Sequence, residues 1–150
     1  MAGKFFGRFE HSLDSKGRIV LPAKFRANFE TRMFLTQHYD KCVALWTPEE
    51  FDKVLASMEE AQSLSAADRN RVRVWASGAT EVEIDRQGRV PIPSWLRAYA
   101  GLEDGEEVLI MGAIERIELW KRSEWEARVL PSEDELINPP KAPAAVPPGE

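Results

Sequence analysis

A chain of 150 residues with 43% hydrophobic and 30% charged residues has the composition of a small globular protein with a modest core. No apolar run approaches the ~18 residues of a membrane-spanning helix, and the N-terminus lacks the apolar stretch of a secretory signal. The single cysteine, Cys42, cannot form an internal disulfide, so we expect a cytoplasmic protein with Cys42 in its core. The net charge of -5 argues, at first sight, against nucleic acid as a partner.

The first half of the chain shows an alternation of strand and helix signals. Residues 9–13 and 18–21 are predicted to be strands joined by a tight turn in a hairpin, because turn-forming residues separate two β-rich runs. A short helix over 23–29 follows a proline suited to a first helical turn. Two further strands are expected near 33–36 and 43–46.

Two longer helices are predicted in the middle of the chain. Thr47 and Glu50 form a capping box with Pro48 at the first helical position, so a helix begins at Pro48. Ser65 opens a second helix that runs to about Ser77. The first of these helices carries an apolar stripe made of Phe51, Val54, Leu55 and Met58.

The second half repeats the order of the first. Its expected elements are strands over 82–84, 89–92, 107–111 and 117–120, a helix over 93–100 closed by Gly101, and a helix start at a capping box formed by Ser123 and Glu126. From Pro131 onward apolar residues become scarce and six of the ten prolines gather, which predicts a disordered acidic tail.

One thirteen-residue phrase occurs twice, as DSKGRIVLPAKFR over 14–26 and DRQGRVPIPSWLR over 85–97. The offset is 71 throughout, with five identities, and chance rarely matches a turn, an apolar alternation and a helix start together. Three further pairs stay apolar: Ile19 with Val90, Leu21 with Ile92, and Phe25 with Leu96. We therefore divide the chain into repeat one (8–55), linking helices (56–78), repeat two (79–123), a closing helix (124–130) and a tail (131–150).

The repeated phrase predicts two loops that present cations. The aspartate can accept backbone N–H groups and fix the turn, and the glycine can adopt the positive φ that a side chain would disfavour. A rigidly held arginine can then align with phosphate or guanine. The residues expected to shape the loops are Asp14, Gly17, Asp85 and Gly88, and those expected to bind are Lys16, Arg18, Arg86 and Arg89. A purely structural pairing of Arg18 with Asp14 is the alternative.

Positive charge is concentrated near the first loop. Residues 1–26 hold six lysines and arginines against two acids, a charge of +4, whereas 131–150 carry -3. Such a basic face suits contact with phosphate because salt screens charges beyond ~10 Å. On charge alone, a solvated surface explains these cations equally well.

The strings LDSKGRIVLPAKFR, DRQGRVPIP and IELW resemble the MraZ family of bacterial transcriptional regulators, which have two SpoVT/AbrB-type repeats. The resemblance covers roughly residues 5–130. It implies an α/β, mostly β, swapped-hairpin AbrB-like barrel of two pseudo-symmetric repeats. It also implies a ring-shaped homo-oligomer in the nucleoid that binds short G-rich direct repeats of double-stranded DNA at the promoter of the division and cell-wall gene cluster. The first-loop arginine that contacts DNA in this family corresponds to Arg18, whereas Gln87 replaces the cation Lys16 in the second loop.

Other functions find less support in the residues. The paired aspartates suggest a proton-sharing dyad, but a cation beside each would keep both ionised, so we expect no enzyme, catalytic residue or cofactor. His11, His38 and Cys42 make no convincing zinc set. An antitoxin-like module that grips a partner protein is the second candidate function, and a ring-forming scaffold is the third.

Overall fold

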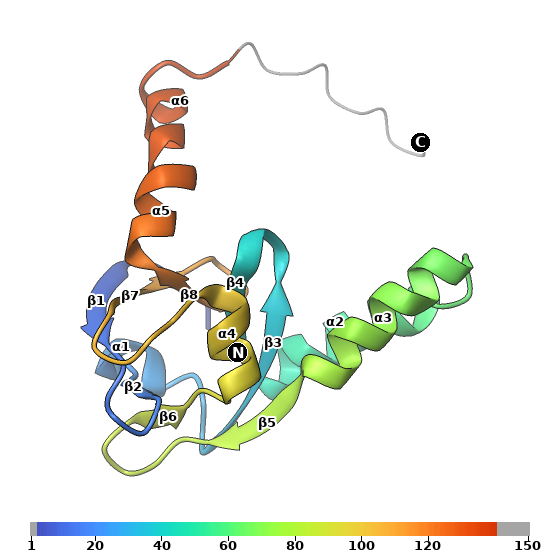
Figure 1. Cartoon of the computed structure of the whole chain (residues 1–150), viewed down its shortest axis with the longest axis horizontal. Helices are drawn as coiled ribbons and strands as arrows, with labels where there is room; N and C mark the ends of the chain where they lie inside the picture. Colours follow the sequence, from blue (N-terminus) through green and yellow to red (C-terminus); the bar gives the residue numbers. More distant parts are fainter. Residues whose placement is uncertain (1–2, 141–150) are drawn as a thin grey trace.

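Six strands from both halves of the chain form one antiparallel sheet in the computed structural model, which describes residues 3–140 (Figure 1). The strands are β1 (Arg8–Ser12), β2 (Arg18–Val20), β3 (Arg32–His38), β4 (Cys42–Trp46), β5 (Thr80–Glu83), β6 (Arg89–Pro91), β7 (Glu107–Gly112) and β8 (Ile117–Lys121). The helices are α1 (Ala23–Arg26), α2 (Pro48–Ala61), α3 (Ala66–Gly78), α4 (Ser94–Ala100), α5 (Arg122–Arg128) and α6 (Glu133–Ile137), with 3-10 turns η1 (Tyr39–Lys41) and η2 (Leu130–Ser132). No helix within residues 3–140 is long and apolar enough to cross a bilayer.

The strand order mixes the two repeats. The large sheet runs β1-β7-β8-β4-β3-β5, and β2 pairs with β6 in a separate two-stranded sheet. Repeat one therefore supplies β1 to the β7–β8 hairpin of repeat two, and repeat two supplies β5 to the β3–β4 hairpin of repeat one. This exchange makes the swapped AbrB-like barrel of two pseudo-symmetric halves that the sequence resemblance implies.

The strands that flank each repeated loop do not pair with each other, so the predicted simple hairpins are wrong. β1 pairs with β7, and β2 pairs with β6, with Ile19 opposite Val90. Apart from the bond that closes the turn itself, one backbone hydrogen bond joins the two sides of the first loop, from Asp14 N to Arg18 O at 2.9 Å. The short strands β2 and β6 carry apolar residues that become buried when the two strands pair. The free energy gained by this burial exceeds what pairing within each local hairpin would give.

The core contains matched residues from both repeats. The three apolar pairs of the repeated phrase are all at most 2% exposed: Ile19 with Val90, Leu21 with Ile92, and Phe25 with Leu96. They belong to one cluster that also takes residues from β3, β4, β7 and β8. Burial of each such side chain stabilises the fold by ~1.5–3 kcal/mol. Because one cluster contains residues of both repeats, the two halves share one core rather than two.

Helix α2 packs its apolar stripe against β3 and β4. Phe34 and Phe51 stack with ring centroids 4.1 Å apart, and Trp75 of α3 joins the same cluster. The Thr47 hydroxyl accepts from the backbone N–H of Glu50, which confirms the predicted cap. Helices α2 and α3 form a hairpin that projects from the sheet (Figure 1).

The C-terminal region differs from the sequence prediction in two respects. Helix α5 begins at Arg122 with Lys121 as its N-cap and no side-chain cap bond, so the capping box predicted at Ser123 is wrong. Strand β8 runs straight into this helix, which places Ser123 inside the first turn. Residues 131–137, expected to be disordered, lie in η2 and α6 with exposed apolar side chains at Leu136 and Ile137, and residues 141–150 of the predicted tail lie outside the described residues.

Candidate nucleic-acid interface

The first repeated loop is a tight turn built around a carboxylate. Gly17 N donates to Asp14 O at 3.0 Å, with Gly17 at a φ of 74°. The Asp14 Oδ1 atom accepts from the backbone N–H groups of Lys16 and Arg18, both at 2.9 Å. One side chain thus satisfies two backbone donors and fixes the loop, as predicted for an Asx-type turn.

The second loop repeats this geometry with different side chains. Gly88 N donates to Asp85 O at 2.9 Å, with Gly88 at a φ of 79°. Asp85 Oδ1 accepts from the N–H groups of Gln87 and Arg89, both at 2.9 Å. Both predicted turns are therefore present with the same hydrogen-bond pattern.

Each loop arginine pairs with its own aspartate through a single nitrogen. Arg18 Nε lies 2.8 Å from Asp14 Oδ2, and Arg89 Nε lies 2.6 Å from Asp85 Oδ2. The Nη groups of both arginines make no hydrogen bond to any residue within 3–140. An ion pair this accessible to water adds little to stability, so its main effect is to orient the guanidinium while the Nη groups stay available.

The loop aspartates are held in the ionised form. The backbone N–H of Arg18 donates to the Asp14 carboxylate and lowers its pKa below the usual value, helped by the Arg18 side chain. The N–H of Arg89 lowers the pKa of Asp85 in the same way. Two carboxylates that both stay ionised beside their own arginines do not share a proton, which removes the basis of the dyad considered above.

The two loops stand at opposite ends of the short β2–β6 ladder. Gly17 O accepts from Ile92 N at 2.9 Å, and Gly88 O accepts from Leu21 N at 2.7 Å. Three strand residues separate these contacts, which corresponds to ~10 Å. In Figure 1 both loops lie at the end of the molecule away from α5 and α6.

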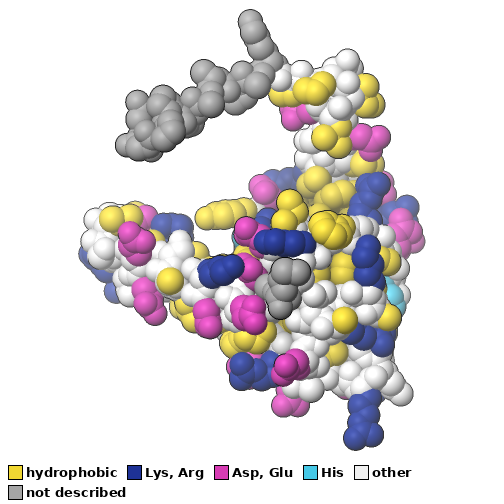
Figure 2. All heavy atoms as spheres, turned by 180° about the vertical axis from the view of Figure 1, so that it is seen from behind, with side chains coloured by type: hydrophobic (Ala, Val, Ile, Leu, Met, Phe, Trp, Pro, Cys, Tyr) yellow, Lys and Arg dark blue, Asp and Glu magenta, His cyan; other side chains and the backbone are white. Residues whose placement is uncertain are grey.

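The cations of the N-terminal region do not all gather at the first loop. Lys16 and Arg86 are exposed at the loop tips, as expected. Arg8 instead lies over an indole ring of α5, and Lys24 lies over a phenyl ring near the N-terminus. In Figure 2 basic and acidic side chains are intermingled over the visible face, so this face has no separate basic surface. The overall charge of the chain is -5.

Two arginines that sequence reasoning gave no role lie at the loops. Arg97 of repeat two lies against Gly17 in the first loop, and Arg26 of repeat one lies against Gly88 in the second. The signal for them was present, because this arginine is one of the five identities of the repeated phrase. Its role was missed because the contact crosses between the repeats.

Comparison with known proteins identifies the family. The family model described as "MraZ protein, putative antitoxin-like" matches the chain twice, over residues 5–74 and 75–142. The chain belongs to the MraZ family. The two matches also confirm the duplication found in the sequence.

Relatives in the MraZ family cover most of this chain. A protein of Acetivibrio thermocellus named transcriptional regulator MraZ is 40% identical over 82% of this chain and 85% of its own length. Proteins of the same name from Paenarthrobacter aurescens and Halothermothrix orenii are 43% and 42% identical over 81% of this chain and 83% of their own lengths. The name describes a transcriptional regulator, which is a non-enzymatic role.

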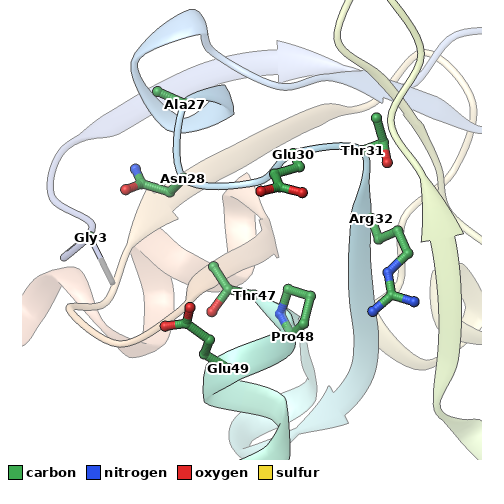
Figure 3. Close-up of a pocket in the computed structure, with 9 residues that line it drawn as sticks. All are labelled: Gly3, Ala27, Asn28, Glu30, Thr31, Arg32, Thr47, Pro48 and Glu49. Atoms are coloured by element: carbon green, nitrogen blue, oxygen red, sulfur yellow. The ribbon is translucent and has the colours of Figure 1, made fainter. Parts of the chain in front are cut away.

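A polar pocket of about 500 Å3 lies where the connection after α1 meets the start of α2 (Figure 3). Two of its polar side chains already have a role in the fold. The Thr47 hydroxyl caps α2, and Arg32 lies 3.5 Å from a carboxylate oxygen of Glu81. No residue of either repeated loop lines this pocket, so it is separate from the loop site of the MraZ-family chain.

The histidines and the cysteine lie apart from the loop site as well. The exposed ring of His11 lies next to the backbone carbonyl that follows it in β1. Cys42 is fully buried opposite His38 in the β3–β4 ladder, and this burial raises the pKa of its thiol. Among residues 3–140 no three histidine, cysteine, aspartate or glutamate side chains are arranged to hold a metal ion.

The two loop glycines should tolerate alanine less well than a glycine with the same backbone angle elsewhere. Gly105 has a φ of 78° with nothing within 4 Å of the position that an added methyl group would take, whereas a methyl group at Gly88 would overlap the Arg26 guanidinium. We expect Gly105→Ala to lower the free energy of unfolding by ~1–2 kcal/mol, the cost of a left-handed alanine, and Gly88→Ala to lower it further. Urea unfolding of both variants measures this, and equal losses would contradict the close contact.

Proposed function

We propose that the chain is a sequence-specific DNA-binding transcriptional regulator whose two repeated loops contact the duplex. The observation that carries the proposal is the pair of turns with the same hydrogen-bond pattern, each with an arginine whose Nε is fixed by the loop aspartate and whose Nη atoms make no hydrogen bond to any described residue. Lys16 and Arg86 would contact phosphate at the loop tips, and Arg18 and Arg89 would contact phosphate or a guanine edge.

Membership of the MraZ family supports the finer parts of the proposal. The protein would act as a ring-shaped homo-oligomer in the cytoplasm, associated with the nucleoid. Its operator would be short G-rich direct repeats of double-stranded DNA at the promoter of the division and cell-wall gene cluster. A regular array of repeats suits such a protein because a ring presents many copies of the same loop.

Removing the first-loop arginine should weaken DNA binding strongly. Arg18→Ala deletes an oriented guanidinium, and a lost base or phosphate contact of this kind costs ~1–3 kcal/mol, or ~5–150-fold per site. Fluorescence anisotropy with a duplex carrying the G-rich repeats measures the loss. Arg69→Ala is the matched control, because it also removes one positive charge and Arg69 is exposed on α3 away from the loops. An Arg18→Ala protein that binds as tightly as wild type would refute the assignment.

A protein-interaction module is the second candidate function, and one feature favours it. A groove of about 630 Å3 is lined by residues of the α2–α3 hairpin and of β3 and β4, and apolar and aromatic side chains contribute most of its lining, among them Met58, Val74 and Trp75. Selection of bound duplexes from a random DNA library distinguishes the two functions. Enrichment of one motif supports the regulator, and enrichment of nothing supports the interaction module.

A further inference from the structure

The last residue of each repeated phrase is an arginine that turns back onto its own strand end. Arg26 Nε donates to Leu21 O at 2.7 Å, and Arg97 Nε donates to Ile92 O at 2.9 Å. Both side chains are partly buried. Each guanidinium is therefore fixed by a hydrogen bond and by packing, and is less mobile than that of an ordinary surface arginine.

The fixed guanidinium of each repeat packs on the loop of the other repeat. A β-carbon at Gly17 would lie 2.8 Å from Arg97 Cζ, and one at Gly88 would overlap the Arg26 guanidinium. The glycines are thus needed for this close approach as well as for their positive φ. The same strand ends also bond to the opposite loops, because Leu21 N donates to Gly88 O and Ile92 N donates to Gly17 O.

The two crossings differ in their charge balance. Arg97 Nη1 lies 3.7 Å from Asp104, so part of its charge is compensated beside the first loop. Arg26 has no carboxylate within 4.0 Å among residues 3–140. The cations at the second loop, Arg26, Arg86 and Arg89, thus face one carboxylate of Asp85, whereas the first loop has two acids, Asp14 and Asp104, near its cations.

We propose that Arg26 and Arg97 are positioning residues, each of which holds the binding loop of the opposite repeat. That this positioning affects DNA binding rests on the function proposed above. In this arrangement each loop depends on one arginine of the other repeat, and Arg26 also gives the second loop the charge that Gln87 fails to supply. Loss of an arginine from repeat one therefore weakens the loop of repeat two.

Hydrogen exchange tests the positioning without DNA. In the full-length Arg26→Ala protein, peptides covering 85–89 should exchange about two- to tenfold faster, the effect of losing the guanidinium that packs on Gly88, whereas peptides covering 14–18 should keep their rate. Arg97→Ala should give the mirror result. Lys24→Ala, which removes an exposed cation from the same helix as Arg26, should change neither loop. Faster exchange at 14–18 in Arg26→Ala, or no change at either loop, would overturn the proposal.

Double-mutant cycles test the same positioning through DNA affinity on one duplex. Arg26→Ala should weaken binding about tenfold. In the double variant Arg26→Ala/Arg89→Ala, the loss of affinity should be smaller than the product of the two single losses by about threefold or more. With Arg18→Ala, in the loop of its own repeat, the effects should multiply to within about twofold. Coupling to Arg18 in place of Arg89 would overturn the crossed assignment.

Arg26→Lys separates charge from positioning. Lysine keeps the charge but lacks the planar group that donates to Leu21 O, so we expect fast exchange at 85–89 as in Arg26→Ala. Full recovery of DNA affinity with this fast exchange would show that Arg26 acts only as a charge, and would overturn the positioning role. If the wild-type protein binds no duplex, the proposed function falls, while the exchange measurement still decides whether the arginines hold the loops.

Discussion

Residues 1–64 and 65–150, expressed separately, should each fail to form a stable monomer. The first fragment keeps the β3–β4 hairpin but lacks the partners of β1 and β2, and the second keeps β7–β8 but lacks the partners of β5 and β6. A lone two-stranded hairpin is at best marginally stable in water, so we expect unfolded or self-associating fragments. Circular dichroism and analytical ultracentrifugation of each fragment measure this.

Mixing the two fragments provides the control. The break between residues 64 and 65 falls in the connection between α2 and α3, where the side chains are exposed, so it removes no core contact. The mixture should therefore regain the strand signal and the mass of the intact chain. A well-folded monomer from either half alone would contradict the exchange of strands between repeats.

Local signals predicted most of the elements correctly because those signals depend on neighbouring residues. The capping residue Thr47 and the C-terminal Gly101 of α4, with a φ of 69°, both lie where the sequence placed them. The Asx-type turns are also determined locally, since Asp14 and Asp85 bond to residues two and four positions along the chain. Such short-range chemistry can be inferred from a single sequence.

The missed features depend on long-range pairing. A strand, a turn and a strand in succession favour a hairpin locally, yet β2 pairs with β6, which follows it by about seventy residues. The contact of Arg26 with Gly88 exists only because of that pairing. The N-terminal cations were grouped by their positions in the sequence, but Arg8 contacts α5 and Arg26 contacts the second loop. Sequence neighbours therefore gave a misleading estimate of the charge around each loop.

The net charge of -5 sets a condition on how such a protein could bind DNA. One subunit offers few cations at its loops, and two of them already pair with aspartates. Each neutralised phosphate contributes ~0.9 to the slope of log affinity against log salt, so a single subunit should bind weakly and dissociate at moderate salt. Several linked subunits raise the effective local concentration, and avidity gains of ~10²–10⁴ follow without any new contact. The acidic remainder of the surface would then disfavour binding away from the operator.

DNA affinity should therefore rise steeply with the number of repeats in the operator. On duplexes of one fixed length, we expect three or four G-rich repeats to bind ~10²–10⁴ times more tightly than one repeat, with a steeper salt dependence. Anisotropy titrations at several salt concentrations measure both quantities, with scrambled repeats in the same duplex as the control. An insertion of about half a helical turn between repeats should abolish most of the gain, because neighbouring loops would then face opposite sides of the duplex. If one repeat binds as tightly as four, or if the half-turn insertion has no effect, each subunit binds independently and oligomerisation is not required.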